Sequence, residues 1–131
     1  MSKFKASIID IQSEQELHIV SFNAHGVILK MISLDLNDNI KVDTNVQLTC
    51  KATTVALAKE FKGSLSYSNQ ILMKIAIINH GELLSSLILQ KEDFTLESII
   101  TTSSLERMNL QVNDEVTALI KSSDLSIIGI L

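Results

Sequence analysis

The chain has 131 residues, of which 46% are hydrophobic and 20% charged, and its net charge is −4. This composition is typical of a folded protein. A negative chain with a single arginine, Arg107, and 4% aromatic residues lacks the basic, stacking surface that nucleic acids require, so we expect no nucleic-acid partner. No apolar run reaches the roughly 18 residues of a membrane span, and no signal peptide follows Met1. We therefore expect a cytoplasmic protein with no membrane partner.

Short runs of strand-like sequence recur along the chain, with turn-forming residues between them. Apolar residues alternate with polar ones at residues 46–50 and 116–120, and β-rich runs occupy residues 72–78 and 83–89. The chain has no proline and four glycines, so Asn, Asp and Ser must form most of the turns. These runs predict about five short strands in each half.

Only the second half contains a helix signal. Ser103 can cap a helix, and Glu106 three residues later completes a capping box over residues 105–109. Residues 34–39 of the first half have no such box. We therefore predict one short helix, in the second half.

The second half of the chain repeats the first. Lys51 and Lys121 lie 70 positions apart within similar apolar patterns. Further upstream the apolar residues match at shifts of 68 and then 67, and the shift of 68 pairs Ser33 with Thr101. Two copies of one small domain are therefore expected.

Two domains follow from this repeat, at residues 1–63 and residues 64–131. Copies of about 65 residues are near the lower limit of independent stability, so they should pack against each other or against other chains. Five short strands with one helical turn are typical of Greek-key barrels, because closure of the barrel hides the strand edges. The fold class that we expect is all-β, with two tandem OB-like Greek-key β-barrels.

No group of residues indicates an enzyme. The three histidines, His18, His25 and His80, have neither metal-ligand nor catalytic spacing, and two of them precede a glycine, as turn residues do. The lone Cys50 lies on the apolar face of residues 46–50, which favours a core thiol over a reactive one. We expect no catalytic residues and no metal site.

Hydrogen-bond donors are the most distinctive chemistry of the second half. A fully deprotonated tetrahedral oxyanion only accepts hydrogen bonds, so its site needs several O–H and N–H donors with little net positive charge. Such groups occur at Ser66, Asn69, Thr101, Ser104, Lys121 and Ser122. Serine and threonine are also common at strand ends and in turns, so spacing alone leaves a purely structural role open.

Four segments of the second half resemble successive motifs of one known family. They are L-S-Y-S-N-Q-I at residues 65–71, I-T-T-S-S at residues 100–104, M-N-L-Q-V-N-D-E-V at residues 108–116 and A-L-I-K-S-S at residues 118–123. These are similar to the L-S-A-R-N-x-L, I-T-x-x-S, L-G-L-x-x-G-x-x-V and A-x-I-K-A-S motifs of the molybdenum-pterin-binding-like family, also called Mop or TOBE. The chain thus resembles a tandem Mop protein.

This resemblance implies a homo-oligomer, commonly a trimer, that binds molybdate or tungstate between domains for storage or homeostasis. The site residues that the family motifs imply are Ser66, Asn69, Thr101, Ser104, Lys121 and Ser122 in the second copy, and Lys51 and Ala52 in the first. Molybdate at neutral pH carries no proton, whereas phosphate does, so a site made only of donors should favour molybdate by about 1–3 kcal/mol. Tungstate is nearly isosteric with molybdate and should bind in the same way.

This sequence departs from the family pattern at two places. Ser68 stands where the family has an arginine, which removes a positively charged group from the expected site. In the first copy Ser33 takes the place of the family threonine and Leu36 that of the serine, so Lys51 keeps few companions. We therefore expect the first copy to be mainly architectural, unless it completes sites with segments from the second copy of a neighbouring chain.

Two other classes of function remain open from the sequence. The family's barrels also occur attached to transport ATPases and transcription factors, so the chain could be an anion-sensing regulatory or protein-interaction module. It could also be an oligomeric scaffold that has lost ligand binding.

Overall fold

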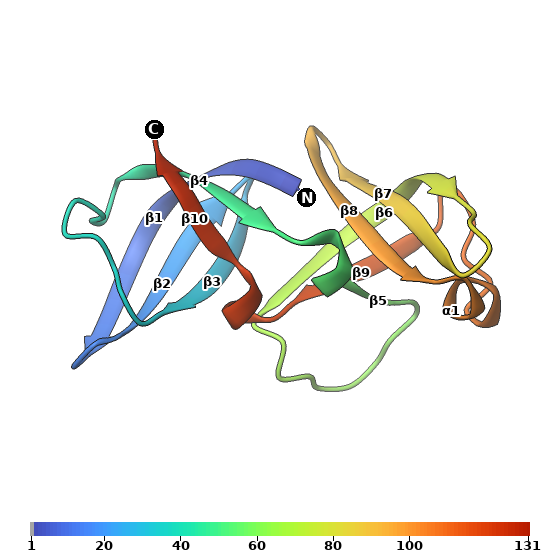
Figure 1. The fold of residues 1–131 in the computed structure, drawn as a ribbon, viewed down its shortest axis with the longest axis horizontal. Helices are drawn as coiled ribbons and strands as arrows, with labels where there is room; N and C mark the ends of the chain where they lie inside the picture. Colours follow the sequence, from blue (N-terminus) through green and yellow to red (C-terminus); the bar gives the residue numbers. More distant parts are fainter. Residues whose placement is uncertain (1) are drawn as a thin grey trace.

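The computed structural model describes residues 2–131 and consists of two five-stranded β units placed side by side along its long axis (Figure 1). The first half of the chain forms β1 (Ser2–Glu14), β2 (Leu17–Ala24), β3 (Val27–Ser33), β4 (Asn45–Cys50), the 3₁₀ turn η1 (Ala52–Thr54) and β5 (Ala56–Ala58). The second half forms β6 (Asn69–Asn79), β7 (Leu84–Lys91), β8 (Phe94–Thr101), α1 (Thr102–Arg107), β9 (Glu115–Ile120), the 3₁₀ turn η2 (Ser122–Asp124) and β10 (Ser126–Ile130). The predicted all-β class, with about five strands in each unit and one short helix, is confirmed.

Each sheet takes one strand from the other half of the chain. The strand order is β10-β4-β1-β2-β3 in the first sheet and β5-β9-β6-β7-β8 in the second. The last strand, β10, runs antiparallel to β4 of the first unit, while the short β5 runs antiparallel to β9 of the second (Figure 1). This exchange of strands connects the two units. The division of the chain into two domains between residues 63 and 64 stays a prediction.

The two units repeat each other in their backbone hydrogen bonds. In the first, the N–H of Asp43 donates to the carbonyl of Ile8 at 2.8 Å; in the second, the N–H of Asn113 donates to the carbonyl of Ile75 at 2.8 Å. Asp43 and Asn113 also share a left-handed backbone, with φ of 75° and 76°. This correspondence confirms the internal repeat at the shifts of 67 and 70.

The shift of 68 that the sequence suggested for β3 and β8 is wrong by one residue. His18 pairs with Ser33 in the first sheet and Ser85 pairs with Ile100 in the second, so Ser33 corresponds to Ile100. Since side chains on a strand alternate between faces, a slip of one residue exchanges buried for exposed positions. The counterpart of Thr101 is therefore Leu34, an apolar side chain that is 72% exposed.

One continuous aliphatic core runs through both units. Phe4 of the first unit and Phe94 of the second meet with ring centroids 4.9 Å apart, and the His25 ring stacks on Phe94 at the same distance. His25 forms the β2–β3 turn with the following glycine, as its sequence predicted. Cys50 is 2% exposed, and burial raises the pKa of its thiol to about 11, which confirms the predicted core thiol.

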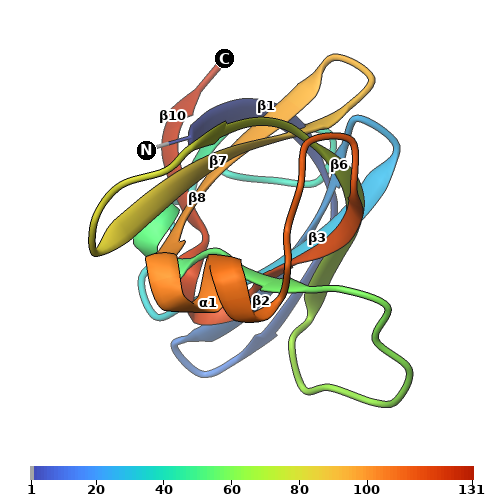
Figure 2. The same ribbon diagram turned by 90° about the vertical axis from the view of Figure 1, so that its right-hand side faces the viewer.

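Helix α1 closes the outer end of the second unit (Figure 2). It begins earlier than predicted, because Thr101 rather than Ser103 is the N-cap: the Thr101 hydroxyl accepts the N–H of Ser104 at 3.2 Å. Leu105 of the helix and Leu110, just after its end, are both buried. Residues 34–44 of the first unit form bends and turns without a helix, as the missing capping box predicted.

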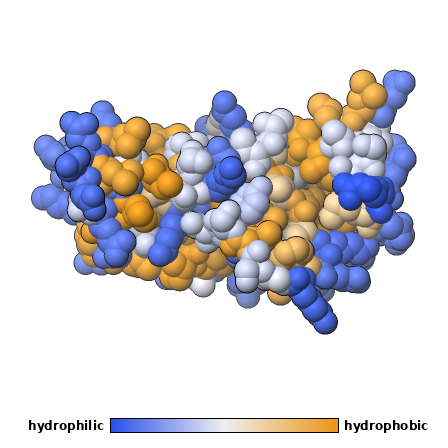
Figure 3. All heavy atoms as spheres, turned by 90° about the horizontal axis from the view of Figure 1, so that it is seen from below, coloured by the Kyte–Doolittle hydropathy of each residue, from blue (hydrophilic) through white to orange (hydrophobic). Residues whose placement is uncertain are grey.

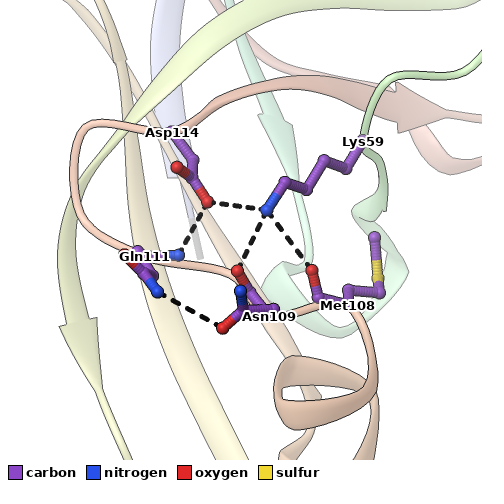
Figure 4. Close-up of polar contacts among 5 residues, drawn as sticks. All are labelled: Lys59, Met108, Asn109, Gln111 and Asp114. Atoms are coloured by element: carbon purple, nitrogen blue, oxygen red, sulfur yellow. Dashed lines mark hydrogen bonds and ion pairs between the residues drawn. The ribbon is translucent and has the colours of Figure 1, made fainter.

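Lys59, directly after β5, anchors the crossing between the two halves (Figure 4). Its ammonium donates to the carbonyls of Met108 and Asn109 at 3.4 and 3.0 Å, just beyond the end of α1, and lies 3.0 Å from the Asp114 carboxylate. The backbone N–H of Gln111, donating at 2.9 Å, and then Lys59 lower the pKa of Asp114.

Candidate functional site

The structure divides the predicted oxyanion-binding residues of the second copy into two groups. Thr101 and Ser104 lie at the start of α1, together with Ser103 and Arg107, and we call these four residues the helix-start cluster. The other group lies where the two units meet, and we call it the junction group: Ser66, Asn69, Lys121 and Ser122.

Strand direction separates the two groups. Strands β6 and β8 are both antiparallel to β7, so both run from the junction toward α1. Asn69 begins β6 and Thr101 ends β8. An eight-residue strand such as β8 is about 25 Å long, so a single chain cannot bring both groups to one anion.

The helix-start cluster is held by hydrogen bonds among its own hydroxyls. Thr101 Oγ1 donates to Ser104 Oγ at 3.0 Å, and Arg107 donates to the same Ser104 oxygen at 3.2 Å. With both lone pairs of Ser104 Oγ engaged, its own proton is left to donate outward. The Ser103 hydroxyl lies 3.2 Å from Thr101 Oγ1. The arrangement therefore offers a ligand hydrogen-bond donors next to a positive charge.

Arg107 is a member of this cluster that the sequence reasoning missed. It is the only arginine of the chain and lies three positions after Ser104, so one helical turn brings both to the same face. The spacing of three residues between Ser104 and Arg107 would have indicated this contact if the helix had been predicted to begin at Thr102. Arg107 places a positive charge beside Ser104, at the opposite end of the second sheet from Ser68.

Asn69 joins the two units through its side chain. Its Oδ1 accepts the backbone N–H of Lys30 at 2.7 Å, and its Nδ2 donates to the carbonyl of Lys30 at 2.9 Å. The side chain is fully buried, with 0% exposed. The Asn69 side chain thus forms the same pair of hydrogen bonds with the Lys30 backbone of β3 that a residue of a neighbouring strand would form. Its role in anion binding stays a prediction.

The remaining residues of the junction group lie nearer the surface. Lys121 follows the last residue of β9, immediately before η2, and is exposed, while Ser122 is half-buried. Ser66 is exposed in the segment between β5 and β6. These three residues can reach a ligand from outside the chain.

The first copy presents its lysine in the same backbone setting. Lys51 precedes η1 with φ −77° and ψ 137°, and Lys121 precedes η2 with φ −66° and ψ 146°. Ala52 is buried, so only its backbone can meet a ligand. A pocket of about 470 Å³ lies beside Lys51 and extends to the second turn, at Ser123 and Asp124.

Ser33 and Leu36, the expected first-copy counterparts of the family threonine and serine, line a different cavity. This groove of about 540 Å³ runs between β3 and β10 and is lined mainly by apolar side chains, with Asp35 as its one charged residue. The structure therefore does not bring Ser33 and Leu36 together with Lys51 in that groove.

Comparison with known families defines the class of the second unit. The model of the TOBE domain family matches residues 65–127, which lie within the second half of the chain. The match confirms the resemblance that the motifs of the second half indicated.

A solved structure extends the likeness to the whole chain. The protein is similar to a structure described as the cytoplasmic molybdate-binding protein ModG, crystallised with molybdate bound. The TM-score is 0.89 and the sequence identity 18%, and the match covers 99% of this chain and 96% of that one. The likeness establishes the tandem fold of both units. No curated protein sequence matches the chain.

Proposed function

We propose that the protein binds molybdate, and equally tungstate, as a small tetrahedral oxyanion. The helix-start cluster is the observation that carries the proposal, because its hydrogen bonds leave Ser104 to donate beside the charge of Arg107. The fold supports it, since the similar ModG structure is that of a molybdate-binding protein. The roles that we propose are donation by Ser104 and Arg107, with Thr101 holding Ser104 in place, from one side, and donation by Lys121, Ser122 and Ser66 from the other.

The chemistry of these groups suits an anion without protons. Hydroxyl, ammonium and guanidinium groups can all donate to the four oxygens of molybdate. Phosphate would bring an O–H that finds no acceptor among charged donors, at a cost of about 1–3 kcal/mol. Binding and release then need no covalent step, so we propose a binding protein and not an enzyme.

Completion of the site requires a second chain, because the two groups lie at opposite ends of the second sheet. We therefore propose a homo-oligomer, a trimer by family resemblance, in which the helix-start cluster of one copy meets the junction group of another. Apolar side chains remain exposed on this unit, including Leu83 just before β7, Leu84 at its first position and Leu72 on β6, which are 80%, 58% and 54% exposed. Apolar areas also interrupt the polar surface in Figure 3. Such surface is suited to contact between copies.

Molybdate titration of two lysine variants tests the site. We expect Lys121→Ala to weaken molybdate binding by roughly tenfold to a hundredfold, because a charge-assisted hydrogen bond is worth about 1.5–3 kcal/mol. Lys51→Ala should have a smaller effect, since the helix-start residues have no counterpart beside Lys51. Calorimetry would contradict the assignment if both variants bound molybdate as the unmodified protein does, or if Lys51→Ala were the more defective.

Storage or homeostasis of the oxyanion in the cytoplasm is the biological role that we propose. Elemental analysis of protein purified from cells grown with molybdate and tungstate should find the metal bound, and light scattering should give a multiple of 14.5 kDa. A monomer without bound metal would contradict both the shared site and the role. A stable oligomer that binds no oxyanion would favour a scaffold instead, and copurification of a specific partner would favour a regulatory module.

A further inference from the structure

The groove between β3 and β10 lies where the first unit lacks a helix. The repeat shift is 67 at Ser33, which matches Ile100, and 70 at Asp43, which matches Asn113, so the first unit is three residues shorter between these points. Three residues are close to one turn of an α-helix. In the second unit the longer segment forms α1, and its Leu105 is buried. The shorter segment forms bends and turns, and the groove beside it has a volume of about 540 Å³.

A lysine of the second unit occupies the position that corresponds to one wall of this groove. Lys59 follows the β5 residue that pairs with Thr117, and Ile130 follows the β10 residue that pairs with Gln47, which is 70 positions before Thr117. Ile130 thus takes the place of Lys59 and lines the groove. The ammonium of Lys59 reaches the carbonyls after α1 (Figure 4), whereas the side chain of Ile130 has no polar group. The first unit therefore lacks the ammonium that the second unit supplies from its own chain.

The polar groups of the groove are suited to a cation. Asp35 is the one charged residue of its lining, and within residues 2–131 the Asp35 carboxylate has no hydrogen-bond or ion-pair partner. The neighbouring pocket shares Asp35 and Leu36 with the groove and adds Glu16 and His18. Among the described residues, no lysine or arginine lines either pocket. An ammonium group can therefore pair with Asp35 without competition from a basic side chain of the lining.

The rest of the groove is suited to a hydrocarbon chain. Apolar side chains line it from both sides, including Met31 and Leu36 on one side and Ile127 and Ile130 on the other. Small-molecule sites typically have volumes of about 300–1,000 Å³ and combine apolar walls with a few polar groups that orient the ligand. We propose that this groove binds a small amphipathic amine, whose hydrocarbon part lies between β3 and β10 and whose ammonium pairs with Asp35. Such a ligand has the same two parts as the Lys59 side chain, an aliphatic stem and an ammonium.

Hexylammonium is a suitable probe, and hexan-1-ol is its matched neutral control, because the two differ only in the polar group. Each is titrated into the full chain at pH 7, and amide chemical shifts measured by NMR report the affinity and the place of binding. Because Asp35 is exposed, its ion pair with the ligand contributes only a few-fold in affinity. Hexylammonium should therefore bind about threefold to fivefold more tightly than hexan-1-ol, with the largest shift changes in β3 and β10.

Two substitutions test the two parts of the site separately. Asp35→Asn should reduce the preference for hexylammonium to about one, whereas Asp10→Asn, which removes an exposed carboxylate from β1, should leave it unchanged. An added Cβ at Gly129 has no atom within 4 Å, so Gly129→Leu places a side chain in the groove and should weaken both ligands by at least about tenfold. Circular dichroism of each variant confirms that it is folded.

Three results would overturn the proposal. They are the absence of saturable shift changes in β3 and β10, equal or tighter binding of hexan-1-ol, and an unchanged preference in Asp35→Asn. The groove shares no residue with the proposed molybdate site, so molybdate titration of the same variants should be unaffected. The amine proposal and the molybdate proposal can therefore fail independently.

Discussion

Replacing Asn69 by alanine tests whether its buried side chain is a structural link between the two units. The change removes two hydrogen bonds to Lys30, of 2.7 and 2.9 Å, and leaves the Lys30 N–H and carbonyl without these partners. A hydrogen bond contributes about 0.5–1.5 kcal/mol net, and each buried group left unpaired costs about 1–3 kcal/mol. Because Lys30 lies on an edge strand where water can partly replace the amide, we expect a loss of about 2–4 kcal/mol in the free energy of unfolding.

Thermal and urea unfolding, followed by far-UV circular dichroism without molybdate, measure this loss. For a chain of this length about 4 °C of melting temperature corresponds to 1 kcal/mol, so Asn69→Ala should melt about 8–16 °C lower. Asn79→Ala is the matched control at the other end of β6, where the side chain is exposed and makes one 3.3 Å hydrogen bond to Ser86, and it should change stability by less than about 0.5 kcal/mol. An unchanged melting temperature for Asn69→Ala, combined with lost molybdate binding, would refute the structural role and make Asn69 an anion ligand.

Three further predictions follow from local geometry. Gly81→Ala should lower the free energy of unfolding in urea by about 2–4 kcal/mol, because an added Cβ would lie 2.0 Å from the Leu84 carbonyl oxygen. Gly129→Ala should be nearly neutral, because an added Cβ there would have no atom within 4 Å. Equal effects of the two changes would contradict this reasoning. Folding lowers the pKa of Asp114 from its usual 3.8, so the carboxylate stabilises the protein above that pH and this stabilisation is lost as the pH falls through the lower folded pKa. Asp114→Asn should flatten this part of the acid-unfolding profile. An unchanged profile would argue against the Asp114 contacts. Cys50, with a pKa raised from 9.0 to about 11, should react with iodoacetamide at pH 8 at least about 100-fold more slowly in the folded than in the unfolded protein, and rapid labelling of the folded protein would contradict its burial.

The strands and the repeat could be predicted because they depend on local patterns. Alternation of apolar and polar residues at positions 46–50 and 116–120 marks β4 and β9, whose Val46, Leu48, Val116 and Ala118 are all buried. Polar residues in turns with left-handed backbone replaced the missing glycines, as Asp43 does before β4. Such signals need no knowledge of distant contacts.

Features that depend on partners far along the chain could not be predicted in the same way. The sequences of β5 and β10 do not show that these strands are exchanged between the two sheets. A short apolar strand can pair with the edge of either sheet. The slip of one residue between β3 and β8 arose because Ile28 and Leu96 look alike in sequence, although Ile28 is 53% exposed and Leu96 only 1%. The pairing of neighbouring strands decides which face of the sheet a side chain occupies, and a single sequence does not show that pairing.

The separation of the proposed site into two groups, by contrast, was already contained in the order of the motifs. Asn69 stands at the start of the first strand of a three-strand meander, and Thr101 stands at the end of the third. Successive strands joined by short turns run in opposite directions, so the start of the first and the end of the third must lie at opposite ends of the sheet. If an anion needs donors from both ends, it must lie between two chains. For the site that we propose, an oligomer thus follows from strand direction together with the condition that one anion takes donors from both ends, and loss of molybdate binding on dilution to the monomer would be its direct consequence.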